Sequence, residues 1–253
     1  ISKQAEIVIC TGRMCSSTIS LLKKYIPSFV GKANLITYNG GRVKDAKGSL
    51  IYESSIDKNT ALEISEYFLK KSIYFQVYID DQLYTYKDCD KIKDYSSHAS
   101  VEYIVHENLT DLIRYASSGP NKLLVIDEPE KLAVVQEYVG KYFSGAQSVM
   151  SFRNYLDIVP VGVSKGNALK IMAFKLGANI SEAFVFGDSQ NDISMLQLTE
   201  NSFAMGNSTE NVKKVCKYII PTNDEEGVAQ ILEKILDSDD IDIFCNSSYS
   251  SWN

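Results

Sequence analysis

Short apolar runs alternate with amphipathic segments along most of this chain, which predicts strands alternating with helices. The continuous apolar run at residues 7–10 is typical of a buried parallel strand. Residues 16–25 follow with apolar positions on one helical face, and residues 35–38 form the next apolar run. Strand, helix and strand in this order indicate a parallel sheet with a crossover connection.

The middle of the chain, residues 42–160, has a different pattern. Two alternating runs at 73–79 and 83–86 flank the turn Asp80-Asp81 and predict a hairpin. Asp57 can cap a helix that ends near residue 71. Helices are also predicted at 110–116 and 129–142, and strands at 122–126, 147–152 and 155–159. Hairpin strands combined with helices indicate an α+β module.

From Gly162 the alternating pattern resumes. Predicted helices lie at 165–175, 192–198, 208–215 and 227–236, and predicted strands at 183–186, 202–205 and 218–220. We therefore predict an α/β fold with a doubly wound parallel, Rossmann-like core. The expected domains are a discontinuous core at 1–41 and 161–236, an inserted α+β domain at 42–160 and a flexible tail at 237–253. Glycines at the two junctions are the expected hinges for this insertion.

Composition narrows the classes of protein. The 253 residues are 45% hydrophobic and 23% charged, as in a soluble globular protein. A net charge of −6 argues against a nucleic-acid groove and against a polybasic membrane contact. No apolar run is long enough to span a bilayer. The five cysteines are scattered and include no Cys-x-x-Cys, which fits a reducing, cytoplasmic setting.

Three polar motifs follow the predicted strands or begin a predicted helix. They are Thr11-Gly12-Arg13, Ser164-Lys165-Gly166 and the stretch Gly187-Asp188-Ser189-Gln190-Asn191-Asp192. The glycine turn in the third motif is expected to place Asp188 and Asp192 side by side at a strand end, where paired carboxylates suit Mg²⁺. A hydroxyl, a lysine and a carboxylate pair in this order indicate a phosphoryl-transfer site.

With these motifs in view, the chain resembles the haloacid dehalogenase superfamily of phosphatases. Further matching segments are residues 35–41, 155–160, 204–207 and 222–229, so the resemblance covers nearly the whole chain. The nearest branch is the Cof-type, subfamily IIB sugar-phosphatase-like group, which has a large C2-type cap between its second and third motifs. The resemblance implies a Mg²⁺-dependent phosphatase that acts on small phosphorylated metabolites, such as sugar phosphates, through an aspartyl-phosphate.

The resemblance also implies roles for individual residues. Thr11 would donate its hydroxyl to a phosphoryl oxygen, and Lys165 would hold the phosphate and the nucleophilic carboxylate. Asp188 and Asp192 would hold Mg²⁺, directly or through water, with Asn191 near the phosphate.

Three more residues are candidates for contact with the substrate. Asn39 and Gly40 lie in a turn that the family uses near the substrate, but a simple turn role explains Asn39 nearly as well. Arg13 is either a substrate contact or part of a structural ion pair, and the sequence leaves both open.

The family's first motif is missing from the 253 residues. That motif, Asp-x-Asp-Gly-Thr, ends the first central strand and carries the nucleophile and the general acid/base. The chain opens at Ile1, so we expect an N-terminally truncated or degenerate copy, truncation being favoured, that is inactive as it stands. The alternatives are a non-catalytic protein that binds a phosphorylated ligand, and a phosphomutase. A bolder hypothesis inserts residues 241–245 into the vacant strand position; a frayed tail is favoured over it. The oligomeric state is left open.

Overall fold

The structure, a computed structural model, describes residues 5–237. Contacts between Cα atoms divide it into two compact units, one formed by Glu6–Ser164 and one that begins at Lys165. The predicted discontinuous core remains a prediction, because this division groups residues 6–41 with the segment that follows them.

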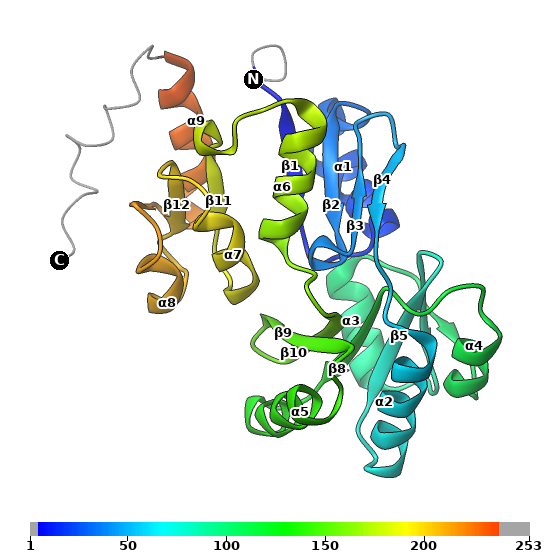
Figure 1. The fold of residues 1–253 in the computed structure, drawn as a ribbon. Helices are drawn as coiled ribbons and strands as arrows, with labels where there is room; N and C mark the ends of the chain where they lie inside the picture. Colours follow the sequence, from blue (N-terminus) through cyan, green and yellow to red (C-terminus); the bar gives the residue numbers. More distant parts are fainter. Residues whose placement is uncertain (1–4, 238–253) are drawn as a thin grey trace. The chain divides into compact units, whose positions relative to one another are not determined.

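The first unit begins with a four-stranded sheet in the order β1-β2-β3-β4 (Figure 1). Its strands are β1 (Ile7–Cys10), β2 (Ala33–Thr37), β3 (Arg42–Lys44) and β4 (Leu50–Glu53). Helix α1 (Cys15–Tyr25) makes the crossover between β1 and β2, which are parallel, as the sequence predicts. Strands β3 and β4 were not predicted. They add to the same sheet in antiparallel fashion, so this sheet extends beyond the expected domain boundary at residue 41.

The rest of the first unit is a six-stranded sheet with helices on its faces. We call residues 54–160, which build it, the inserted module, after the place within the core that the sequence predicts for it. The strand order is β7-β6-β5-β8-β10-β9. Its strands are β5 (Phe75–Ile79), β6 (Gln82–Thr85), β7 (Ile104–Val105), β8 (Lys122–Ile126), β9 (Ala146–Phe152) and β10 (Tyr155–Pro160). Its helices are α2 (Lys58–Lys70), α3 (Asp90–Ala99), α4 (Leu109–Tyr115) and α5 (Pro129–Tyr142).

Most of these elements confirm the predicted α+β module. The hairpin at β5 and β6 forms around Asp80-Asp81, and the Asp57 side chain caps α2 by accepting from two backbone amides. Helix α3 and the two-residue strand β7 were not predicted. Helix α3 is mainly polar and buries only Ile92, Tyr95 and Ala99, which is a weak signal in the sequence.

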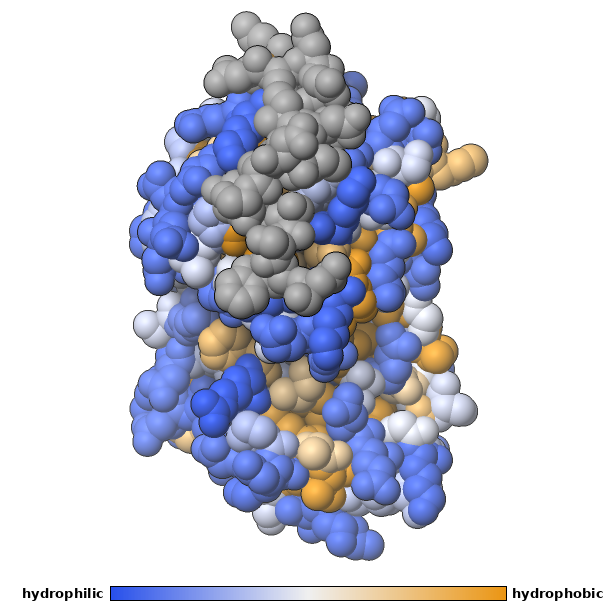
Figure 2. Space-filling model, turned by 90° about the vertical axis from the view of Figure 1, so that its left-hand side faces the viewer, coloured by the Kyte–Doolittle hydropathy of each residue, from blue (hydrophilic) through white to orange (hydrophobic). Residues whose placement is uncertain are grey.

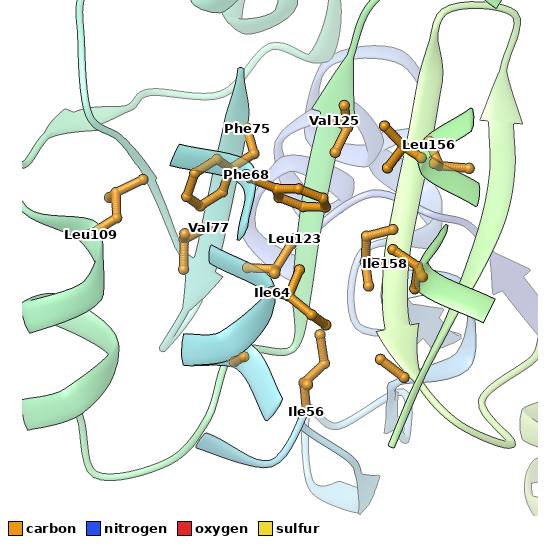
Figure 3. Packing of buried hydrophobic residues seen from close by; sticks show 14 of the residues in the cluster. Ile56, Ile64, Phe68, Phe75, Val77, Leu109, Leu123, Val125, Leu156 and Ile158 are labelled. Carbon is orange, nitrogen blue, oxygen red and sulfur yellow. The ribbon is translucent and has the colours of Figure 1, made fainter. Parts of the chain in front are cut away.

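Strand alternation gives the six-stranded sheet two different faces. One face packs against α2, α4 and α5, and Figure 3 shows Ile64 and Phe68 of α2 against Leu123 and Val125 of β8. The opposite face carries a second cluster that includes Tyr78, Leu124 and residues of α3, and also Met14 and Tyr38 from the four-stranded part. Residues of β8 and β10 that do not face α2 and α5 therefore point toward the ends of β1 and β2.

The second unit contains a parallel three-stranded sheet in the order β11-β12-β13. Its strands are β11 (Val185–Gly187), β12 (Ser202–Met205) and β13 (Tyr218–Ile220), and its helices are α6 (Lys165–Leu176), α7 (Ile193–Leu196), α8 (Glu210–Lys213) and α9 (Gly227–Asp237). Phe186, Phe203 and Tyr218 stack across the three strands. Alternation of helices and parallel strands confirms the predicted α/β class. Segment 241–245 lies outside the described residues.

The surface is polar on the face shown in Figure 2, where hydrophilic residues cover most of the visible area and apolar residues gather in smaller patches. Within residues 5–237, no helix has the length and apolar character needed to cross a membrane.

Candidate active site

The carboxylate of Asp192 is the centre of the polar cluster in the second unit. Its Oδ1 atom is 2.5 Å from the Lys165 ammonium, and its Oδ2 atom accepts hydrogen bonds of 2.9 Å from the backbone amides of Asp188 and Ser189. Asp192 and Lys165 are both buried. A buried ion pair whose remaining lone pairs are hydrogen-bonded has a fixed geometry, so Asp192 sets where the Lys165 ammonium lies.

Two glycines make this arrangement possible. A Cβ atom on Gly187 would lie 2.6 Å from Cβ of Asp192, so only glycine lets the turn after β11 fold over the carboxylate. A Cβ atom on Gly166 would lie 2.1 Å from the backbone oxygen of Ser194. The Gly166 amide also donates to Ser194 Oγ at 3.0 Å, which fixes the start of α6 against α7 and hence the root of Lys165.

Asp188 lies at the carboxyl end of β11 and is exposed. Removal of water from part of its carboxylate and the negative charge of Asp192 raise its pKa. A divalent cation bound beside Asp188 would offset this repulsion from the Asp192 carboxylate. The donor set therefore fits a divalent cation, for which Asp188 would be the accessible oxygen ligand, while Asp192 is engaged with Lys165 and the backbone. Among residues 5–237, no cluster of three or more His, Cys, Asp or Glu side chains could hold a metal ion without further ligands.

Asn191 belongs to the same turn, between the serine that caps it and Asp192. It lies in the short helical turn Gln190–Asp192, which a reciprocal capping box between Ser189 and Asp192 closes. The structure therefore brings together Lys165, Asp188, Asn191 and Asp192, four of the residues that the sequence predicted for the site.

In the first unit, Thr11 follows β1 at the same edge as the end of β2. The Thr11 amide donates to Ile36 O at 2.8 Å, and Thr11 O accepts from the Asn39 amide at 3.1 Å. Its hydroxyl oxygen accepts from the Arg13 amide at 3.2 Å, which closes a tight turn. Because this bond uses a lone pair, the hydroxyl proton of Thr11 can still be donated to a phosphoryl oxygen.

The turn after β2 is built around Asn39, with Gly40 next to it. Tyr38, Asn39 and Gly40 all have positive φ values of 54°, 58° and 105°, a conformation that suits asparagine and glycine. Asn39 is buried, and its Nδ2 atom donates to Asp157 Oδ2 at 2.7 Å. A Cβ atom on Gly12 would lie 2.7 Å from Asn39 Oδ1, so the Thr11–Arg13 turn needs its glycine to pass this side chain.

Arg13 contacts the inserted module. Its Nη1 atom donates to the backbone oxygen of Ala99 at the end of α3, at 2.9 Å, and Ser17 Oγ donates to the same oxygen at 2.6 Å. A cation at the carboxyl end of a helix also interacts favourably with the helix dipole. This contact is structural; a role for Arg13 in substrate binding stays a prediction.

Sequence reasoning missed three charged residues of the inserted module that contact the Thr11 and Asn39 turns or α1. They are Asp81, Lys122 and Asp157. The last two were detectable in principle, because each lies in or beside an apolar strand segment, and a charge in a buried strand requires a partner.

Comparison with known proteins identifies the family. The family model for haloacid dehalogenase-like hydrolases matches residues 1–232. A Streptococcus pyogenes protein, provisionally named a phosphatase, is 32% identical over 239 residues, covering 90% of this chain and 85% of that protein. A Bacillus subtilis protein named 5-amino-6-(5-phospho-D-ribitylamino)uracil phosphatase is 27% identical, covering 91% of this chain and 86% of its own length.

A solved structure shows the same fold. The crystal structure of a Thermotoga maritima protein, TM0651, superposes with a TM-score of 0.80 at 35% identity, covering 94% of this chain and 87% of that one. The family match over most of the chain, together with these relatives, establishes that the chain belongs to the haloacid dehalogenase-like hydrolases.

Proposed function

We propose that this protein is a Mg²⁺-dependent phosphatase that hydrolyses small phosphorylated metabolites, sugar phosphates or compounds like them, through an aspartyl-phosphate. The observation that carries the proposal is the buried Lys165–Asp192 pair next to the exposed carboxylate of Asp188 at the end of β11. A lysine held at fixed position beside a potential metal ligand is what a site for a doubly charged phosphoryl group requires. The relative named as a phosphatase of a ribitylaminouracil phosphate supports a substrate of this size.

The residues of this chain have separate tasks in the proposed reaction. Lys165 neutralises charge on the phosphoryl group, and Asp192 keeps the ammonium in place. Thr11 donates its hydroxyl to a phosphoryl oxygen, while Asn191 lies near the phosphate. Mg²⁺ would be held by Asp188 and Asp192, directly or through water, and would neutralise further charge on the phosphoryl group. Arg13, Asn39 and Gly40 are proposed to lie near the substrate.

The nucleophilic aspartate is not supplied by the 253 residues, which contain no Asp-x-Asp-Gly-Thr. The activity assay is therefore made on the chain joined to the sequence encoded immediately before Ile1. We expect turnover of a panel of phosphate esters that depends on Mg²⁺ and is lost in Lys165→Met. A folded protein with an in-frame Asp-x-Asp-Gly-Thr and no turnover of any ester would contradict the proposal.

The second candidate is a protein that binds a phosphorylated ligand without hydrolysing it, which requires that no nucleophile-bearing strand is encoded before Ile1. The upstream sequence separates the two. A stop codon or unrelated sequence before Ile1 supports the binding protein, and calorimetric binding of a phosphate ester without turnover would then be expected. A phosphomutase is the third candidate, and detection of phosphoryl transfer to a second sugar hydroxyl would support it.

A further inference from the structure

Lys122 and Asp157 form an ion pair inside the first unit, where a charge is expensive. Their side chains are 2% and 1% exposed, and Lys122 Nζ lies 3.0 Å from Asp157 Oδ1. The ammonium also lies 4.6 Å from the centre of the Tyr78 ring. Taking an ion out of water costs several kcal/mol, which only a well-placed partner offsets. Burial opposes the charge of Lys122, but Asp157 outweighs that effect, and the pKa of Lys122 is raised.

Strand geometry explains why both side chains point the same way. Leu123 and Val125 of β8, and Leu156 and Ile158 of β10, face the helices α2 and α5. Lys122 and Asp157 are one residue out of step with these positions, so they face the opposite side, where the ends of β1 and β2 lie. In the β8–β10 register Asp157 is opposite Leu124, which makes it a diagonal neighbour of Lys122.

Each member of the pair holds one of the two turns at the ends of β1 and β2. Lys122 Nζ donates to the backbone oxygen of Gly12 at 3.1 Å. Asp157 Oδ2 accepts from Asn39 Nδ2 at 2.7 Å. Gly12 immediately follows Thr11, and Thr11 itself is bonded to the Asn39 amide through its backbone oxygen. The buried pair of the inserted module thus holds Gly12, which follows Thr11 in the chain, and Asn39, which is bonded to the Thr11 backbone.

We propose that Lys122 and Asp157 are positioning residues, which hold the Thr11–Gly12 turn and Asn39 in the arrangement that binds the phosphoryl group. The proposal rests on the proposed function in one respect, namely that Thr11 contacts phosphate. Neither Lys122 nor Asp157 is assigned a contact with the substrate, because both side chains are buried, paired with each other, and bonded to Gly12 and Asn39 respectively. The competing explanation is that the pair serves stability alone.

A charge-free double variant separates the two explanations. Lys122→Met or Asp157→Leu alone leaves an unpaired buried charge and is expected to lower the melting temperature strongly. The double variant Lys122→Met/Asp157→Leu removes both charges, so its melting temperature should return close to that of the wild type. The double variant still lacks the hydrogen bonds to Gly12 O and from Asn39 Nδ2. If the pair positions the two turns, they should therefore be less firmly held even though stability is restored.

Hydrogen exchange on the 253-residue chain measures how firmly the two turns are held. We expect the amides of Thr11, Tyr38 and Asn39 to exchange about fivefold faster in the double variant, as for the loss of one ordinary hydrogen bond. The amide of Val185, which donates to Asn201 O in the second unit, should be unchanged. The matched control removes an exposed pair of the inserted module, Lys93→Met/Asp88→Leu, and should leave all four amides unchanged.

The activity readout uses the chain joined to its nucleophile-bearing sequence. We expect kcat of the double variant to fall about 10- to 100-fold, because a misplaced contact to the reacting group costs rate, while KM changes much less. Wild-type exchange at Thr11, Tyr38 and Asn39 together with wild-type kcat would overturn the proposal and leave a structural pair. Absence of turnover in the wild type would refute the proposed function, and the exchange result would still decide the positioning role.

A second double variant covers the case in which the first does not fold. Lys122→Met/Asp157→Asn keeps a side-chain oxygen that can accept from Asn39 and removes only the hydrogen bond from Lys122 to Gly12 O. Faster exchange at Thr11 with unchanged exchange at the more distant Val185 is then expected. Exchange at Thr11 equal to the wild type in a folded protein would contradict the role assigned to Lys122.

Discussion

Gly166 shows how one residue without a side chain can determine where a charged neighbour lies. The closest atom to a Cβ at this position would be a backbone oxygen, Ser194 O, at 2.1 Å. Backbone cannot move aside as the end of a side chain can. The start of α6 and the backbone position of Lys165 therefore depend on glycine at 166. The reason is the lack of space for a side chain beside Ser194, and not a backbone conformation that only glycine adopts.

A pair of glycine-to-alanine variants tests this explanation. Gly166→Ala should destabilise the protein by about 1–3 kcal/mol, the usual cost of overpacking. A Cβ atom added to Gly140, inside α5, would have no neighbouring atom within 4 Å, so Gly140→Ala should stabilise by about 0.5–1 kcal/mol through helix propensity. Chemical denaturation of both variants gives the sign of each change in the free energy of unfolding. A Gly166→Ala variant as stable as the wild type would mean that α6 can shift away from Ser194 at no cost.

Glu53 gives a prediction about pH. Its carboxylate is bonded to Arg42 and accepts from Asn121 Nδ2 at 3.0 Å. Although partial burial opposes the charge, these bonds dominate and lower the pKa of Glu53. A lowered pKa in the folded state means that the unfolded chain binds the proton more tightly. The stabilisation is therefore present above the unfolded pKa, near 4.3, and is lost as pH falls through the folded pKa.

Glu53→Gln should consequently be less stable than the wild type at pH 7 by about 0.2–1 kcal/mol, the range for partly exposed pairs. The difference should shrink as the pH is lowered below about 4. Urea unfolding at several pH values measures it. A difference that is constant from pH 7 to pH 3 would show that the ionised form of Glu53 contributes nothing.

At the scale of elements, helix α1 receives its amino-terminal cap from another part of the chain. Met14 occupies the cap position and makes no side-chain bond there. Asp81, at the tip of the β5–β6 hairpin, accepts instead from the amides of Cys15 at 2.9 Å and Ser16 at 2.8 Å. The same carboxylate accepts from the buried Tyr38 hydroxyl at 2.7 Å. The β5–β6 hairpin thus supplies the amino-terminal cap of α1, which the residue at the cap position of α1, Met14, does not provide.

Asp81→Ala should cost about 1–2 kcal/mol for the lost cap, and more because the buried Tyr38 hydroxyl loses its acceptor. Asp57→Ala, which removes the local cap of α2, is the matched control and should cost only the cap itself. Thermal unfolding compares them, and Tyr38→Phe in the Asp81→Ala background should recover the additional loss. Equal destabilisation by Asp81→Ala and Asp57→Ala would indicate that the Tyr38 bond is not significant.

Across the whole molecule, elements with a strong apolar period were predictable and contacts far apart in sequence were not. Helix α5 was predicted at 129–142, where the structure has it, and β8 at 122–126. Strands β3 and β4 were missed because they are short, and β4 is largely exposed. Asp188, Asp192 and Lys165 were found because their spacing around a glycine turn is a local signal. Lys122 and Asp157 are 35 residues apart in numbering, and only the β8–β10 register brings them together.

The two ends of the four-stranded sheet differ in a way that predicts how the chain behaves in solution. Strand β1 stands at one end of the order and has the uncharged sequence Ile-Val-Ile-Cys. At the other end, Glu53 of β4 pairs with Arg42 of the neighbouring strand. Terminal strands without charge or proline can pair with other chains, whereas charged ones resist it. If the edge of β1 is open in the 253-residue chain, β1 and not β4 is the end of the sheet through which copies would pair.

Val8→Lys should weaken that association about fivefold, which corresponds to ~1 kcal/mol for charges brought face to face across a new strand pair. Tyr52→Lys places the same charge on β4 and serves as the control, with little effect expected. Sedimentation over a range of protein concentrations measures both, and circular dichroism checks that each variant is folded. If the wild type remains monomeric at every concentration, or if both lysines weaken association equally, β1 is not the contact. In that case some other surface shields the strand, and the difference between the two sheet ends has no consequence in solution.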